Sequence, residues 1–94
     1  MGFKECEKKA LRELKRAEKK AAPQWLINYI KALIIKSQYL YTLSKNKKDW
    51  DAEFRRSHLN RAKMLNLDAM NLARAFISPE IYERFSSDAT RIIN

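Results

Sequence analysis

The sequence predicts an all-α protein, a small bundle of three to four antiparallel helices. Ala, Leu, Lys, Arg and Glu, which favour helices, are abundant among the 94 residues, whereas Gly occurs once and Pro twice. No stretch alternates apolar and polar residues as a strand does. Apolar residues instead recur every three or four positions, which indicates helices over about 3–22, 23–44, 49–77 and 79–93. At this length the whole chain, 1–94, is expected to form a single domain.

The first helix, 3–22, has a narrow apolar stripe and a strongly charged remainder. Half of the stripe is alanine, so its burial contributes little free energy. We therefore expect residues 1–22 to form a loosely packed, basic N-terminal helix. The stripe consists of Phe3, Cys6, Ala10, Leu14, Ala17 and Ala21.

The second helix, 23–44, is expected to be the central one. Its apolar side chains spread over roughly 200° of the helix circumference, whereas an ordinary surface helix has a stripe only somewhat wider than about 100°. Such a width predicts cover on more than one side. Pro23 separates this helix from the first, because a residue that precedes proline is disfavoured in the α conformation. Ser37 lies within the apolar arc, and we expect its hydroxyl to bond a carbonyl of its own helix.

The last two helices are marked by capping signals. Asp49 is a suitable N-cap for the third helix, and Glu53 lies in its first turn, where acidic residues are favoured. The sequence Ser78-Pro79-Glu80 combines an N-cap, a proline at the first helical position and an acid. The fourth helix would present Ile81, Tyr82, Phe85, Ala89 and Ile92.

The charge of the chain is unevenly distributed. The formal net charge is +9, the sequence pI is about 9.9, and the excess of Lys and Arg arises within residues 1–48. This asymmetry predicts an anionic macromolecule as the partner. Antiparallel packing would bring one basic group to each end of the bundle. The first group is Lys4, Lys8, Lys45, Lys47, Lys48, Arg55 and Arg56, and the second is Lys15, Arg16, Lys19, Lys20 and Arg74.

Nucleic-acid binding through N-terminal basic surfaces is the function that these charges favour. The alternative is a protein–protein interaction module of the inhibitor, adaptor or immunity type that docks on an acidic partner surface. A homo-oligomeric structural protein, such as a homodimer, is the third hypothesis. For the first two functions the expected contact residues are Lys4, Lys8, Arg12, Lys15, Lys19, Lys45, Lys47, Lys48, Arg55 and Arg56.

Signals for catalysis are weak, so we expect no enzymatic activity, no cofactor and no metal site. The chain has no glycine-rich phosphate loop and no nucleophile elbow. His58 is expected to be a core residue, and Cys6 a small hydrophobic one. A single cysteine and a charged stretch at 1–22 predict a reducing, cytoplasmic location. Lys31 and Lys36 interrupt the most apolar helix, so no transmembrane segment is expected.

Overall fold

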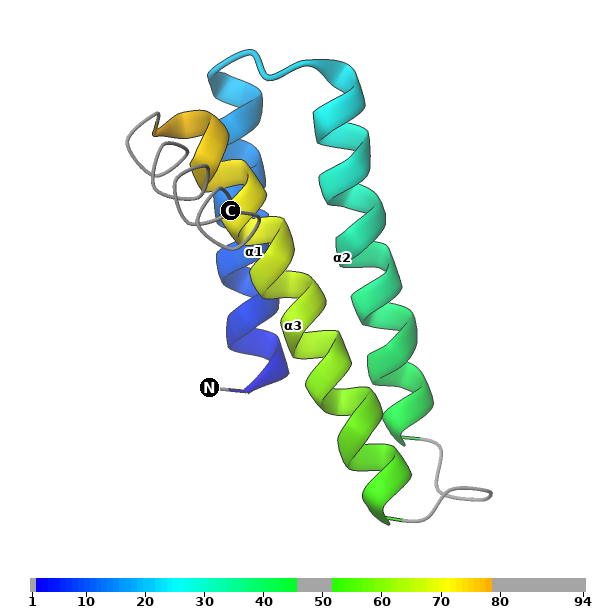
Figure 1. Cartoon of the computed structure of the whole chain (residues 1–94). Helices are drawn as coiled ribbons and strands as arrows, with labels where there is room; N and C mark the ends of the chain where they lie inside the picture. Colours follow the sequence, from blue (N-terminus) through cyan, green and yellow to red (C-terminus); the bar gives the residue numbers. More distant parts are fainter. Residues whose placement is uncertain (1, 46–51, 79–94) are drawn as a thin grey trace, which may run out of the picture.

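The described part of the protein forms three helices. The computed structural model describes residues 2–45 and 52–78, and within them lie α1 (Phe3–Lys19), α2 (Gln24–Lys45) and α3 (Ala52–Ile77), with no strand. Each helix runs antiparallel to the one before it (Figure 1). The predicted all-α bundle is therefore confirmed. The fourth helix expected at 79–93 and the N-cap expected at Asp49 lie outside the described residues.

The sequence suggested that α2 would be the central helix, but α3 occupies that position. α3 packs extensively against both neighbours, whereas α1 and α2 touch each other at far fewer positions. Its inner face carries Ala62, Ala69 and Ala73, which are all fully buried. Because alanine side chains are short, two helices can approach this face closely from either side.

A left-handed residue ends α1 three positions earlier than the sequence suggested. Ala21 has φ of 58°, the only positive value among the non-glycine residues described. The Ala22 N–H donates to the carbonyl of Ala17 at 3.1 Å, and the Ala21 N–H donates to that of Glu18 at 3.0 Å. This pair of bonds is a Schellman motif, which usually has glycine at the left-handed position. The chain then turns, and the carbonyl of Pro23 accepts the first hydrogen bonds of α2.

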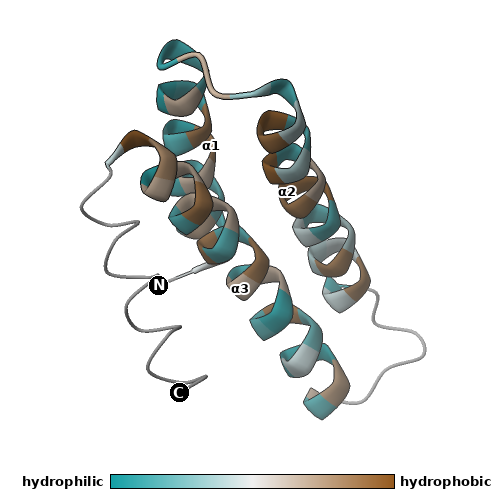
Figure 2. Cartoon of the chain, turned by 45° about the horizontal axis from the view of Figure 1, so that its top comes forward, coloured by the Kyte–Doolittle hydropathy of each residue, from teal (hydrophilic) through white to brown (hydrophobic). Residues whose placement is uncertain are grey.

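The core consists of two clusters along the bundle. Apolar residues line the inner sides of the helices, and hydrophilic residues cover the outer side of α1 (Figure 2). The larger cluster joins all three helices through Leu14, Ile30, Ile34 and Met70, among others. The smaller one contains Phe3, Leu40 and Ala62 and lies toward the end of α2.

The apolar stripe of α1 is buried, as its periodicity indicated. Phe3, Cys6, Ala10, Leu14 and Ala17 are all at most 6% exposed, although Ala21 is exposed. Burial does not measure how strongly a helix is held, so the weak attachment expected of residues 1–22 stays a prediction. Within the described ranges, no helix has the combination of length and hydrophobicity that crossing a membrane requires.

Candidate basic binding surface

Five cationic side chains form a continuous line along the outer face of α1. All five are exposed, and they follow one another at intervals of four, four, three and four residues. These intervals place them on one face of a helix, roughly opposite the buried stripe, over a length of about 22 Å. We call this line the α1 basic stripe; it consists of Lys4, Lys8, Arg12, Lys15 and Lys19.

The glutamates of α1 do not neutralise this stripe. Glu13 is only 4% exposed and faces α3 rather than solvent. The carboxylate of Glu7 accepts a hydrogen bond from Gln38 Nε2 of α2 at 3.2 Å. Glu5 and Glu18 are exposed, but their positions fall on the flanks of the stripe. Like charges at i and i+4 destabilise a helix by a few tenths of a kcal/mol per pair, and the stripe contains three such pairs. An anion bound along it would relieve this repulsion.

Lys4 and Lys45 meet at the ring of Tyr41, where α1 begins and α2 ends. The ammonium groups of Lys4 and Lys45 lie 5.4 Å and 4.4 Å from the ring centroid. The ring of Phe3 stacks on Tyr41 with centroids 4.0 Å apart. A groove of about 340 Å³ opens between these side chains and Thr42. The antiparallel packing thus brings together two lysines that are distant in sequence.

The arginines at the start of α3 lie at a different place on the same end of the bundle. Arg55 and Arg56 line a shallow groove with Ser44 of α2 and Leu59. This groove shares no lining residue with the one around Tyr41. The basic group predicted at this end is therefore divided into two places, one with Lys4 and Lys45 and the other with Arg55 and Arg56. Lys47 and Lys48 were expected in this group, but they lie outside the described residues.

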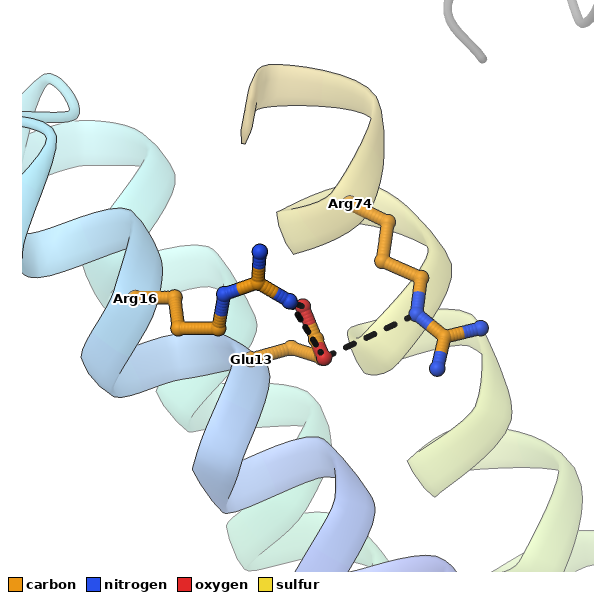
Figure 3. Close-up of polar contacts among 3 residues, drawn as sticks. All are labelled: Glu13, Arg16 and Arg74. Carbon is orange, nitrogen blue, oxygen red and sulfur yellow. Dashed lines mark hydrogen bonds and ion pairs between the residues drawn. The ribbon is translucent and has the colours of Figure 1, made fainter. Parts of the chain in front are cut away.

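At the opposite end of the bundle, two arginines form ion pairs with one buried glutamate. Arg16 Nη1 lies 3.3 Å from the carboxylate of Glu13, and Arg74 Nε lies 3.7 Å from it (Figure 3). Glu13 follows Ala10 by three residues and precedes Ala17 by four, so it belongs to the buried stripe. The spacing of three residues indicates the Glu13–Arg16 pair in the sequence. The burial of Glu13 and its contact with Arg74 were not predicted, because an acidic residue was not expected on the buried stripe.

His58 is half-buried rather than a core residue. Its Nδ1 lies 3.1 Å from the carbonyl oxygen of Phe54, and its ring stacks on that of Phe54 with centroids 4.1 Å apart. Near its beginning α3 extends past the start of α1 (Figure 1), so α1 does not cover this part of the helix and the expected burial is incomplete. Within residues 2–45 and 52–78, no three His, Cys, Asp or Glu side chains cluster in a way that could hold a metal ion.

Comparison with known proteins gives no functional assignment. No protein family, no characterised protein and no solved structure matches this chain.

Proposed function

We propose that this protein is a small non-catalytic binding protein that contacts nucleic acid through the α1 basic stripe. The observation that carries the proposal is the alignment of five exposed cations, from Lys4 to Lys19, with no acid among them. Lysine and arginine side chains neutralise backbone phosphates, and the release of counterions from the nucleic acid drives such binding.

Two features of the fold suit α1 to this role. Its apolar stripe is buried, which fixes the rotation of the helix and directs the basic stripe to solvent. Lys45 lies close to Lys4 across the ring of Tyr41, so the basic surface continues from α1 onto the end of α2. Flexible cationic side chains contact phosphates without reading base edges. We therefore expect weak sequence specificity and a strong dependence on salt.

The proposal is tested by fluorescence anisotropy with labelled DNA and RNA, single-stranded and duplex, over a range of salt concentrations. The test variant is Lys8→Gln/Arg12→Gln/Lys15→Gln, which removes the middle of the stripe. Its matched control is Lys31→Gln/Lys36→Gln/Arg61→Gln, which removes the same charge from exposed positions on α2 and α3. The stripe variant should lose about three units from the slope of log affinity against log salt. The control should keep most of both slope and affinity.

Two results would contradict the proposal. If both variants lose affinity equally, net charge and not the stripe determines binding. If the parent protein binds no nucleic acid at low salt, the function is a different one. In that case an affinity pull-down decides the alternative, since a stoichiometric acidic protein would favour a module of the inhibitor, adaptor or immunity type.

A further inference from the structure

One face of α2 exposes large apolar side chains. Trp25, Tyr29 and Tyr39 are 70%, 55% and 63% exposed, and Ile35 beside them is 64% exposed. Contiguous apolar surface of this kind usually marks a contact site. We call this surface the α2 aromatic face; it consists of Trp25, Tyr29, Ala32, Lys36, Tyr39 and the half-buried Leu43.

Neither α1 nor α3 covers this face, since both lie on the other side of α2 (Figure 1). α1 touches α2 through Gln38, Tyr41 and Lys45. At about 100° per residue, these positions lie roughly opposite Trp25 on the helix. α3 packs on the arc between, where Ser37 is buried against Asn66. Within the described part of the chain, the α2 aromatic face is therefore open.

We propose that the α2 aromatic face binds the same face of a second copy of the chain, with the two α2 helices antiparallel. The first argument is the spacing of its six positions, which are separated by four, three, four, three and four residues. This series is the same in both directions along the helix. Two copies can therefore pair at every position from Trp25 to Leu43, as in a coiled coil, and the contact closes with twofold symmetry.

The second argument is the set of side chains that this register brings together. Tyr29 lies opposite Tyr39 of the second copy, so aromatic rings meet on both sides of the symmetry axis, a favourable contact. Ala32 lies opposite Lys36 of the second copy. The small alanine leaves room for the aliphatic part of the lysine while its ammonium group reaches solvent. The pairing thus buries no charge and forces no two large side chains into the centre.

The third argument is area. At their exposed fractions, the three aromatic side chains present roughly 400 Å² per copy, because a residue of this type buries about 150–250 Å². The exposed side chains of Ala32, Ile35 and Lys36 add to this area. Two copies together therefore reach roughly 1,000 Å², the smallest area expected of a specific interface. An interface of this size predicts a weak, reversible dimer.

Charge decides how the dimer responds to salt. Each copy has a net charge of +9, and all charged residues of α2 are lysines. In the proposed register, the two copies of Lys36 are separated by about 6 Å along the helix axes. Because salt screens this repulsion, dimerisation should strengthen as the salt concentration rises, whereas nucleic-acid binding should weaken. The inference is independent of nucleic-acid binding, since α1 lies on the opposite side of α2 from this face.

Sedimentation equilibrium of the full chain, from micromolar to millimolar concentration, tests the proposal. The mass should rise with concentration from that of one chain, 11.2 kDa, toward twice that value. Tyr29→Ser/Tyr39→Ser should weaken dimerisation at least about tenfold, because it removes the central aromatic contacts. The matched control, Leu11→Ser/Met64→Ser, removes exposed apolar side chains of α1 and α3 and should leave dimerisation unchanged. Circular dichroism checks that each variant is folded.

Lys36→Leu tests the register itself. It removes two like charges near the symmetry axis and adds apolar surface there, so the dimer should become tighter than that of the parent. Lys31→Leu is the matched control, because it removes the same charge from an exposed position of α2 outside the aromatic face. A gain no larger for Lys36→Leu than for Lys31→Leu would contradict the antiparallel register.

A parent protein that stays monomeric at millimolar concentration would overturn the proposal, as would equal dimerisation of the parent and Tyr29→Ser/Tyr39→Ser. In full-length Trp50→Phe protein, Trp25 is the single tryptophan, and its emission should shift to the blue as concentration rises. Emission that is already blue-shifted in the monomer would show instead that the face is covered within one chain. If the tyrosine variant weakens binding of single-stranded nucleic acid while the parent stays monomeric, the face stacks bases and forms no dimer.

Discussion

Ser37 of α2 and Asn66 of α3 meet at the centre of the bundle, with Ser37 Oγ 3.0 Å from Asn66 Oδ1. Both residues are completely buried. Ser37 Oγ also lies 2.6 Å from the carbonyl oxygen of Ile34, which confirms the bond expected within its own helix. A buried polar contact between two helices is satisfied in only one alignment, so this contact favours a single register of α2 against α3.

The protons around Ser37 explain how this contact is made. A serine hydroxyl has one proton, so it donates to one of the two neighbouring oxygens only. Asn66 Nδ2 has no partner within the described part of the chain. Rotation of the amide by 180° exchanges its oxygen and nitrogen. In that orientation Nδ2 donates to Ser37 Oγ and the hydroxyl donates to the carbonyl oxygen of Ile34, so both donors have an acceptor.

Ser37→Ala should reduce the free energy of unfolding by about 1–3 kcal/mol, because it leaves the buried amide of Asn66 without its partner. The double variant Ser37→Ala/Asn66→Leu removes both polar groups and should recover most of this loss. Urea denaturation of both variants and of the parent measures the effect. Additive losses in the double variant would show that the two side chains are not coupled.

Ala21→Gly should stabilise the protein by about 1 kcal/mol, because an L-residue is strained at the positive φ that Ala21 adopts. For a domain of this size the midpoint of thermal unfolding should rise by about 4–8 °C. Ala22→Gly is the matched control. It should destabilise slightly, since glycine increases the entropy of the unfolded chain at a position without that strain. A lower midpoint for Ala21→Gly would contradict the Schellman ending of α1.

Glu13→Ala should destabilise the bundle by about 1–3 kcal/mol, because it removes a buried carboxylate that two arginines contact. Arg16→Ala should cost less than about 1 kcal/mol, since the Arg16 side chain is 58% exposed and water screens its charge. Thermal unfolding of the two variants compares them directly. Equal losses would mean that Glu13 contributes no more than an exposed ion pair.

Hydrogen exchange should show that α1 opens more readily than α3. The buried stripe of α1 includes Cys6, Ala10 and Ala17, which are small and bury little apolar area. Backbone amides around Ala10 should therefore exchange through openings of lower free energy than those around Ala69. Equal protection of the two helices would contradict the loose attachment that the sequence predicts for residues 1–22.

The helices could be predicted well from local sequence, but their arrangement could not. Pro23 marked the boundary between the first two helices within a few residues. The broad apolar arc of α2 suggested a central helix, yet Trp25 and Tyr29 are exposed and α3 occupies the centre. The width of an apolar arc indicates how much of the surface of a helix could be buried. How much of it is buried depends on which other helices pack against it.

The sequence by itself determined the all-α class, the approximate extents of the three described helices and the concentration of positive charge within residues 1–48. These properties depend on helix propensity and on periodicity over a few turns, which neighbouring residues set. Only the tertiary structure decided that Glu13 contacts Arg74, that Lys4 and Lys45 share the ring of Tyr41 and that Ser37 contacts Asn66. Each of these contacts joins residues far apart in the chain, and it forms only when the helices pack at one particular rotation and register.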